Sequence, residues 1–127
     1  MANLKTAEIL ATAFCNGSKH DFQLFKESRC VFSASTLALA DAGYQGLGVI
    51  HPNSQTPAKK TKLHPLSAEQ KAGNRALSRK RMLIENIIRK LKIFRILSER
   101  YRNRRKRFGL RFNLIAAIYN LELKAAC

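Results

Sequence analysis

The segment that decides the fold runs from Ser67 to Leu97 and reads SAEQKAGNRALSRKRMLIENIIRKLKIFRIL. It begins with a capping box, in which Ser67 is followed three residues later by Gln70, and this pattern is typical of helix starts. We therefore expect one long helix that continues through Leu97. Its apolar residues fall on one stripe at helical spacing: Leu83, Ile84, Ile87, Leu91 and Phe94.

Two apolar runs before this helix predict strands. Residues 6–14 are partly β-branched and are followed by an Asn-Gly-Ser turn, so we expect a buried strand there. Residues 36–40 form a second run, which ends at Asp41 and a glycine-bounded turn. A strand at 36–40 would hold Asp41 at its carboxyl end, where open α/β sheets place ligand-binding groups.

Four other segments complete the expected organisation of a single domain. Asp21 is placed to cap a short helix whose Phe22, Leu24 and Phe25 pack inward. Residues 51–66 hold all three prolines and predict a loop. Residues 98–107 are a basic connector, and 108–123 predict a final helix. The apolar side of that helix would comprise Phe108, Phe112, Ile115, Ile118 and Tyr119.

The charge is concentrated in the second half of the chain. The net charge is +16 on 127 residues, yet 46% of the residues are hydrophobic, which excludes a disordered basic tail. Residues 71–111 hold most of the cations and only two acids, Glu85 and Glu99. Such asymmetry indicates a nucleic-acid-binding surface, because neutralised phosphates release counterions. A merely solvated basic face is disfavoured by its self-repulsion.

Several classes of protein are not expected. No apolar run approaches the roughly 18 residues of a membrane span, and the N-terminus lacks the features of a secretory signal. The three cysteines, Cys15, Cys30 and Cys127, lack the spacing of a metal site, so we expect reduced thiols in a cytoplasmic protein.

Two acids are the candidates for chemistry. Glu85 lies on the same predicted helix face as Arg81, Arg89 and Lys92. A carboxylate ringed by cations can hold a divalent metal beside a phosphodiester, but the spacing alone favours ordinary surface ion pairs between these residues. Asp41 alone is likewise more typical of a turn or cap than of a metal ligand.

Four motifs in one order carry a resemblance to a known family. Arg81-x3-Glu85-x6-Lys92 resembles the signature around the catalytic glutamate of bacterial insertion-sequence transposases with an RNase H-like DDE domain. LADAGYQG at 39–46 resembles the segment of their second catalytic aspartate, and GSKHDF at 17–22 matches a motif that precedes it. FRILSERYRNRRKRFGLRFNLIAAIYNLEL, at 94–123, is similar to their C-terminal end.

The sequence departs from this family at two places. Ser78 stands where the full signature has a tyrosine three residues before the arginine. The family's first catalytic aspartate lies on a strand upstream of the one expected at 6–14, where only MANLK stands here. Asp21 does not replace it, since Asp21 belongs to the 17–22 motif.

The resemblance implies an α/β fold: a truncated RNase H-like domain with few strands packed on helices, a long catalytic helix and a C-terminal helix. In the family three carboxylates hold two Mg²⁺ ions, and Mn²⁺ suits the same ligands. Asp41 and Glu85 would be the catalytic and metal-binding residues. The residues expected to hold the DNA backbone are Arg81, Arg89, Lys92, Arg102, Arg104, Arg105, Lys106 and Arg107.

We therefore expect the C-terminal fragment of a DDE transposase, a nucleoid-associated protein that binds DNA but is inactive alone. Its partners would be DNA and an upstream transposase half or a second copy of the chain. The alternative is a small basic RNA-binding protein of the ribosome, which fits the composition but does not explain the pattern around Asp41 and Glu85. A helix-turn-helix regulator is disfavoured by the length of the predicted helix.

Overall fold

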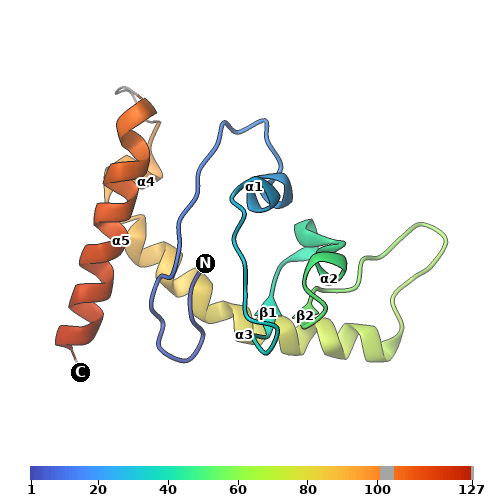
Figure 1. The fold of residues 1–127 in the computed structure, drawn as a ribbon. Helices are drawn as coiled ribbons and strands as arrows, with labels where there is room; N and C mark the ends of the chain where they lie inside the picture. The colour runs from blue at the N-terminus through green and yellow to red at the C-terminus, as the bar shows by residue number, and fades with distance from the viewer. Residues whose placement is uncertain (101–104, 127) are drawn as a thin grey trace. The chain divides into compact units, whose positions relative to one another are not determined.

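The structure is a computed structural model that describes residues 1–100 and 105–126 (Figure 1). The chain divides into two compact units. The central unit is Cys15–Arg81, and the terminal unit combines Met1–Phe14 with Met82–Cys127. The elements are α1 (Asp21–Glu27), β1 (Ala38–Leu39), η1 (Ala42–Tyr44), α2 (Leu47–Ile50), β2 (Ser54–Gln55), α3 (Ala68–Leu91), α4 (Arg95–Ser98), η2 (Arg105–Arg107) and α5 (Phe108–Ala125).

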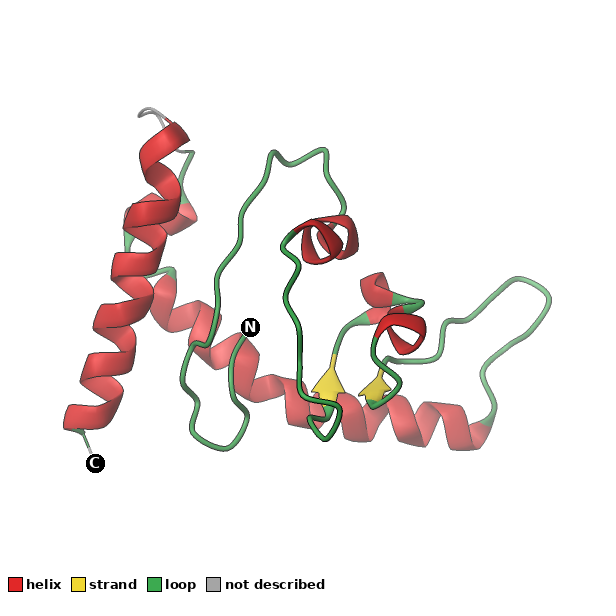
Figure 2. Ribbon diagram, in the orientation of Figure 1, coloured by secondary structure: helices red, strands yellow, loops and turns green. Residues whose placement is uncertain are grey.

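The described residues are rich in helix and contain one small parallel sheet (Figure 2). Strand β1 pairs with β2, with Ala38 opposite Ser54 and Leu39 opposite Gln55. The strand expected at 36–40 is therefore present, though shorter. The predicted loop at 51–66 contains β2 and so is not wholly irregular. A parallel pair among helices is consistent with the expected α/β class.

The central unit is held together mainly by aromatic side chains. Tyr44 packs against Phe22 and Phe25, with ring centroids 5.7 and 6.1 Å apart, and Phe32 extends the cluster. The buried His51 approaches the Thr36 carbonyl with Nε2 at 2.6 Å. These contacts pack the turn after β1 against α1, and they confirm that Phe22 and Phe25 pack inward.

The terminal unit has a core shared by α3 and α5. Ile87 and Leu91 of α3 are buried against Ile115 and Tyr119 of α5. These positions confirm most of the predicted apolar stripes on both helices. Ile118, however, is 37% exposed, so its place in the predicted apolar side was wrong.

Helix α3 begins as predicted and ends earlier. The capping box is formed, because the Ser67 Oγ accepts from the Gln70 N–H at 3.1 Å and the Gln70 side chain accepts from the Ser67 N–H at 3.0 Å. The helix then stops at Leu91 instead of Leu97. The turn that follows brings Ile96 and Leu97 back onto the core. Tertiary packing therefore overrides the local helical pattern.

Phe94 leaves the predicted stripe for the same reason. It precedes α4 as its N-cap, and it is 39% exposed. The prediction placed Phe94 on the core stripe because it assumed an unbroken helix. Since the helix ends at Leu91, helical spacing no longer puts Phe94 on the same face as the residues before it.

The strand predicted at 6–14 was wrong. Only an isolated bridge between Ala2 and Ile9 is present there, and Ala7 has a φ of 60°, which breaks extended backbone. The amide of Asn120 on α5 accepts from the Ile9 N–H and donates to its carbonyl, both at 2.8 Å. A side chain thus satisfies the backbone groups that a neighbouring strand would otherwise pair.

Candidate functional site

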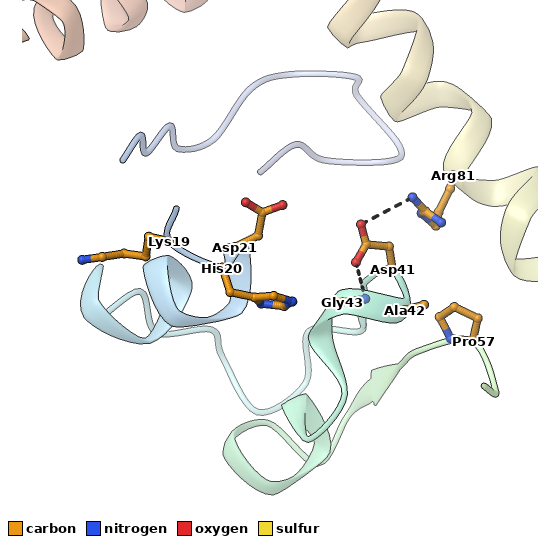
Figure 3. A pocket seen from close by; sticks show the side chains of 8 residues that line it. All are labelled: Lys19, His20, Asp21, Asp41, Ala42, Gly43, Pro57 and Arg81. Atoms are coloured by element: carbon orange, nitrogen blue, oxygen red, sulfur yellow. Dashed lines mark hydrogen bonds and ion pairs between the residues drawn. The ribbon is translucent and has the colours of Figure 1, made fainter. Parts of the chain in front are cut away.

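Asp41 is the carboxylate with the most defined surroundings. It follows β1 and caps η1, because its Oδ1 accepts a hydrogen bond from the Gly43 N–H at 2.8 Å. Its Oδ2 faces the guanidinium of Arg81 on α3 at 3.9 Å, which is an ion pair but too long for a hydrogen bond (Figure 3). One carboxylate oxygen is therefore engaged by the turn and the other stays open to a ligand.

This carboxylate lies in a pocket of the central unit, with a volume of about 530 Å³ (Figure 3). The Gln45 Nε2 donates a hydrogen bond to the Pro57 carbonyl at 2.9 Å, which connects Pro57, on one side of the pocket, to the turn after Asp41. The Asp41 side chain is 43% exposed, so the pocket is wet and its ion pair is weak, ~0–1 kcal/mol. The lining residues are Lys19, His20, Asp21, Asp41, Ala42, Gly43, Pro57 and Arg81.

The helix cap beside the pocket is not the residue that the sequence predicts. His20 is the N-cap of α1, and its Nδ1 accepts from the Phe22 N–H at 3.3 Å. Asp21, predicted as the cap, is the first residue of the helix and lines the pocket instead. The prediction of Asp21 as cap was wrong because a histidine ring at the preceding position satisfies the same orphan N–H.

Burial and nearby negative charge both raise the pKa of the Tyr44 hydroxyl. Burial raises the pKa of Tyr44, and the negative charges of Asp21 and Asp41 raise it further. Both carboxylates therefore act on the same hydroxyl. Asp21 and Asp41 thus contribute to one electrostatic environment in the central unit.

Besides Arg81, the pocket is lined by Lys19, whose charge is already paired with that of Glu27. Lys19 donates to the Glu27 Oε2 at 2.6 Å. This hydrogen bond raises the pKa of Lys19 and lowers the pKa of Glu27. Figure 3 shows the Lys19 side chain extending away from Asp41. Lys19 therefore offers little charge to a ligand beside Asp41.

Glu85 belongs to the terminal unit and is exposed on α3. Among the residues that the structure describes, it forms no ion pair with Arg81 or Arg89. Arg81 pairs with Asp41 instead. The surface ion pairs that the spacing also predicted are thus not formed, and the Glu85 carboxylate remains open to a ligand.

The predicted DNA-binding cations fall into three groups. Arg89 is exposed on α3, and Lys92 is exposed just after the helix ends. Lys106 and Arg107 are exposed in η2. Arg102 and Arg104 lie outside the described residues, as does the side chain of Arg105.

Within residues 1–100 and 105–126, no group of three or more His, Cys, Asp or Glu side chains forms a preassembled metal site. Cys15 and Cys30 are free thiols, while Cys127 lies outside the described residues. In the same part of the chain no helix is long and apolar enough to cross a membrane.

The transposase DDE-domain family model matches residues 1–121. The chain therefore belongs to the insertion-sequence DDE transposases, which confirms the resemblance and disfavours the ribosomal alternative. A probable transposase for insertion sequence element IS702, from Microchaete diplosiphon, is 53% identical over 119 residues. The match covers 94% of this chain and 43% of that relative, so this chain spans less than half of its length. No solved structure matches the chain.

His20 is the pocket residue that the sequence analysis missed as a functional candidate. The signal was present, because the 17–22 motif places histidine directly before the aspartate. The sequence analysis assigned only Asp21 of that motif a task, the capping of the helix, because either of two adjacent polar residues can fill an N-cap position.

Proposed function

We propose that Asp41 and Glu85 are metal-binding carboxylates of an RNase H-like transposase catalytic domain, which holds Mg²⁺ or Mn²⁺ against a DNA phosphodiester. The observation that carries this proposal is the geometry of Asp41. One of its oxygens is fixed by the turn, and the other faces an open pocket with Arg81 beside it. Membership of the DDE family supports the same assignment.

The residues suit a hard divalent cation. Carboxylate oxygens are the ligands that Mg²⁺ and Mn²⁺ prefer, and Mg²⁺ is usually bound through one or two carboxylates with water. The Asp41 Oδ2 has only a long ion pair at 3.9 Å to exchange for a metal contact. A bound cation would polarise the phosphodiester and stabilise the leaving oxygen.

Glu85 is the second ligand in this proposal because it stands where the family signature, here Arg81-x3-Glu85-x6-Lys92, has its catalytic glutamate. Arg81, which pairs with Asp41, precedes Glu85 by four residues on the same helix. That separation is about one helical turn, so the two side chains lie on one face of α3. The absence of an ion pair between Glu85 and its cationic neighbours in the described structure leaves its oxygens available.

The cations near these acids would bind the DNA backbone. Arg89 and Lys92 are exposed on and just after α3, and Lys106 and Arg107 are exposed in η2. Phosphate contacts of this kind give affinity and orientation without reading sequence. We propose that DNA is the nucleic acid, that the isolated chain binds it without cleaving it, and that an upstream transposase half or a second copy completes the site.

The salt dependence of DNA binding tests the backbone contacts. For the double variant Arg89→Gln, Lys92→Gln, the slope of log affinity against log salt should fall by about 1.8, because each lost phosphate contact removes about 0.9. The measurement is fluorescence anisotropy with a short duplex across a salt series.

The matched control is Lys5→Gln combined with Lys60→Gln, which removes the same charge from exposed positions elsewhere. An equal fall in slope for the control would show that only net charge matters and would overturn the assignment. Tighter binding to an RNA duplex than to a DNA duplex of equal length would instead favour an RNA-binding protein.

A further inference from the structure

The pocket around Asp41 contains a hydrogen-bond donor that the proposed function does not use. The His20 Nδ1 accepts from the Phe22 N–H, so this nitrogen cannot carry a proton while the cap is formed. In the neutral ring the proton then belongs to Nε2. The backbone thus selects one tautomer and leaves an N–H donor at the far side of the ring.

That far side is directed toward the turn at Gly43 (Figure 3). A Cβ placed on Gly43 would lie 3.5 Å from the His20 Cε1, 3.8 Å from its Nε2 and only 3.0 Å from the Asp41 Oδ1. The contact with the Asp41 Oδ1 would be tight, whereas the His20 ring is at ordinary van der Waals distance, so the imidazole and the carboxylate both lie beside this turn. Within the described residues, His20 Nε2 has no hydrogen-bond partner.

The charges of the pocket explain why a neutral donor is useful there. Two carboxylates, Asp21 and Asp41, line the pocket. Of its two cations, Lys19 is paired with Glu27 and Arg81 lies 3.9 Å from Asp41, so within the described residues no ion pair compensates Asp21. A phosphate would be repelled from such a pocket until a divalent cation compensates the carboxylates. A neutral N–H can then bind a phosphate oxygen without competing with the metal for Asp41.

We propose that His20 is a substrate-contacting residue, whose Nε2–H donates to a non-bridging phosphate oxygen of the DNA strand held by metal at Asp41. This inference rests on the proposed function, because it needs DNA and a cation in the same pocket. It assigns the 17–22 motif two tasks: Nδ1 fixes α1, and Nε2 contacts the substrate.

The substitution His20→Asn separates these two tasks. Asparagine is a good N-cap, so its side-chain oxygen can accept from the Phe22 N–H and preserve α1, but it is too short to reach the phosphate. His64→Asn is the matched control, because His64 is an exposed histidine in the same unit and does not line the pocket.

The measurement is the affinity of the full chain for a short DNA duplex in Ca²⁺, which binds oxygen ligands as Mg²⁺ does, and again in a metal chelator. We expect the wild type to bind more tightly in Ca²⁺. His20→Asn should weaken binding about ten-fold in Ca²⁺ and leave it unchanged in the chelator. His64→Asn should match the wild type in both. Proton–nitrogen correlation spectra should show the proton of His20 on Nε2 in the free protein.

The outcomes separate this inference from the proposed function. A wild-type affinity that does not respond to Ca²⁺, or a response that survives Asp41→Asn, would overturn both. A Ca²⁺ response that is lost in Asp41→Asn but intact in His20→Asn would overturn the inference about His20 alone. Equal weakening of His20→Asn with and without Ca²⁺ would show a structural role only, and would overturn it as well.

Discussion

At the scale of single residues, Asp41 forms a turn cap with one carboxylate oxygen and leaves the other available for the proposed metal. The sequence left both interpretations open. In the structure the Oδ1 caps the turn through Gly43, while the Oδ2 faces Arg81 and the pocket. Because the cap holds the side chain in one orientation, the free oxygen is positioned before any ligand arrives.

Asn120 gives a residue-scale prediction about stability. Its amide satisfies both backbone groups of Ile9, 111 residues away in the sequence. Asn120→Ala should lower the free energy of unfolding by about 1–3 kcal/mol, since it leaves partly buried polar groups unpaired. Urea unfolding followed by circular dichroism measures this.

The control for that prediction is Asn86→Ala, at an exposed position of α3. It should be neutral or slightly stabilising, because alanine has the higher helix propensity. Equal effects of the two substitutions would mean that the bonds between Asn120 and Ile9 contribute nothing.

At the scale of elements, the features that could be predicted are those written in local sequence. The capping box at Ser67 and the stripe through Ile87 and Leu91 depend on residues within a few turns of each other. The failures involve distant partners. The chain at 6–14 is held by an asparagine on α5, and α3 ends where Ile96 folds back onto the core.

The candidate site also has residues that the sequence could predict and residues whose roles depend on the folded structure. The family motifs identified Asp41 and Arg81, which the structure brings together in one ion pair. They contained His20 but did not indicate the role proposed for it, because that role depends on which nitrogen the helix backbone engages. That choice is a property of geometry in three dimensions, and no spacing in the sequence encodes it.

The start of α3 gives an element-scale prediction. Ser67→Ala removes the acceptor for the Gln70 N–H and should destabilise the helix by about 1 kcal/mol. Ser78→Ala, in the middle of the same helix, should stabilise it by a few tenths of a kcal/mol. Thermal unfolding followed by helical circular dichroism distinguishes them, and a destabilisation by Ser78→Ala equal to that by Ser67→Ala would contradict the capping role.

At the scale of the whole molecule, α5 presents apolar side chains to solvent as well as to the core. Leu110, Leu114 and Leu121 are 73%, 60% and 68% exposed, and they recur at helical spacing. A helix that is apolar on all sides is normally covered. We therefore expect the isolated chain to self-associate and to be poorly soluble.

Sedimentation velocity tests this expectation. The triple variant Leu110→Gln, Leu114→Gln, Leu121→Gln should shift the chain toward monomer, because each leucine contributes ~1.5 kcal/mol or more when covered. Leu63→Gln, at an isolated exposed position in the central unit, should change nothing. Association that is unaffected by the triple variant would place the responsible surface elsewhere.

The most direct test of the central claim is whether Asp41 and Glu85 bind one cation. Mn²⁺ added to the isotopically labelled full chain broadens the NMR signals of nuclei near it. We expect selective broadening at the Asp41 turn and at the α3 turn that carries Glu85, and we expect Asp41→Asn or Glu85→Gln to abolish it at both places. Broadening at only one of the two turns, or broadening at one that survives substitution at the other, would contradict a shared metal site.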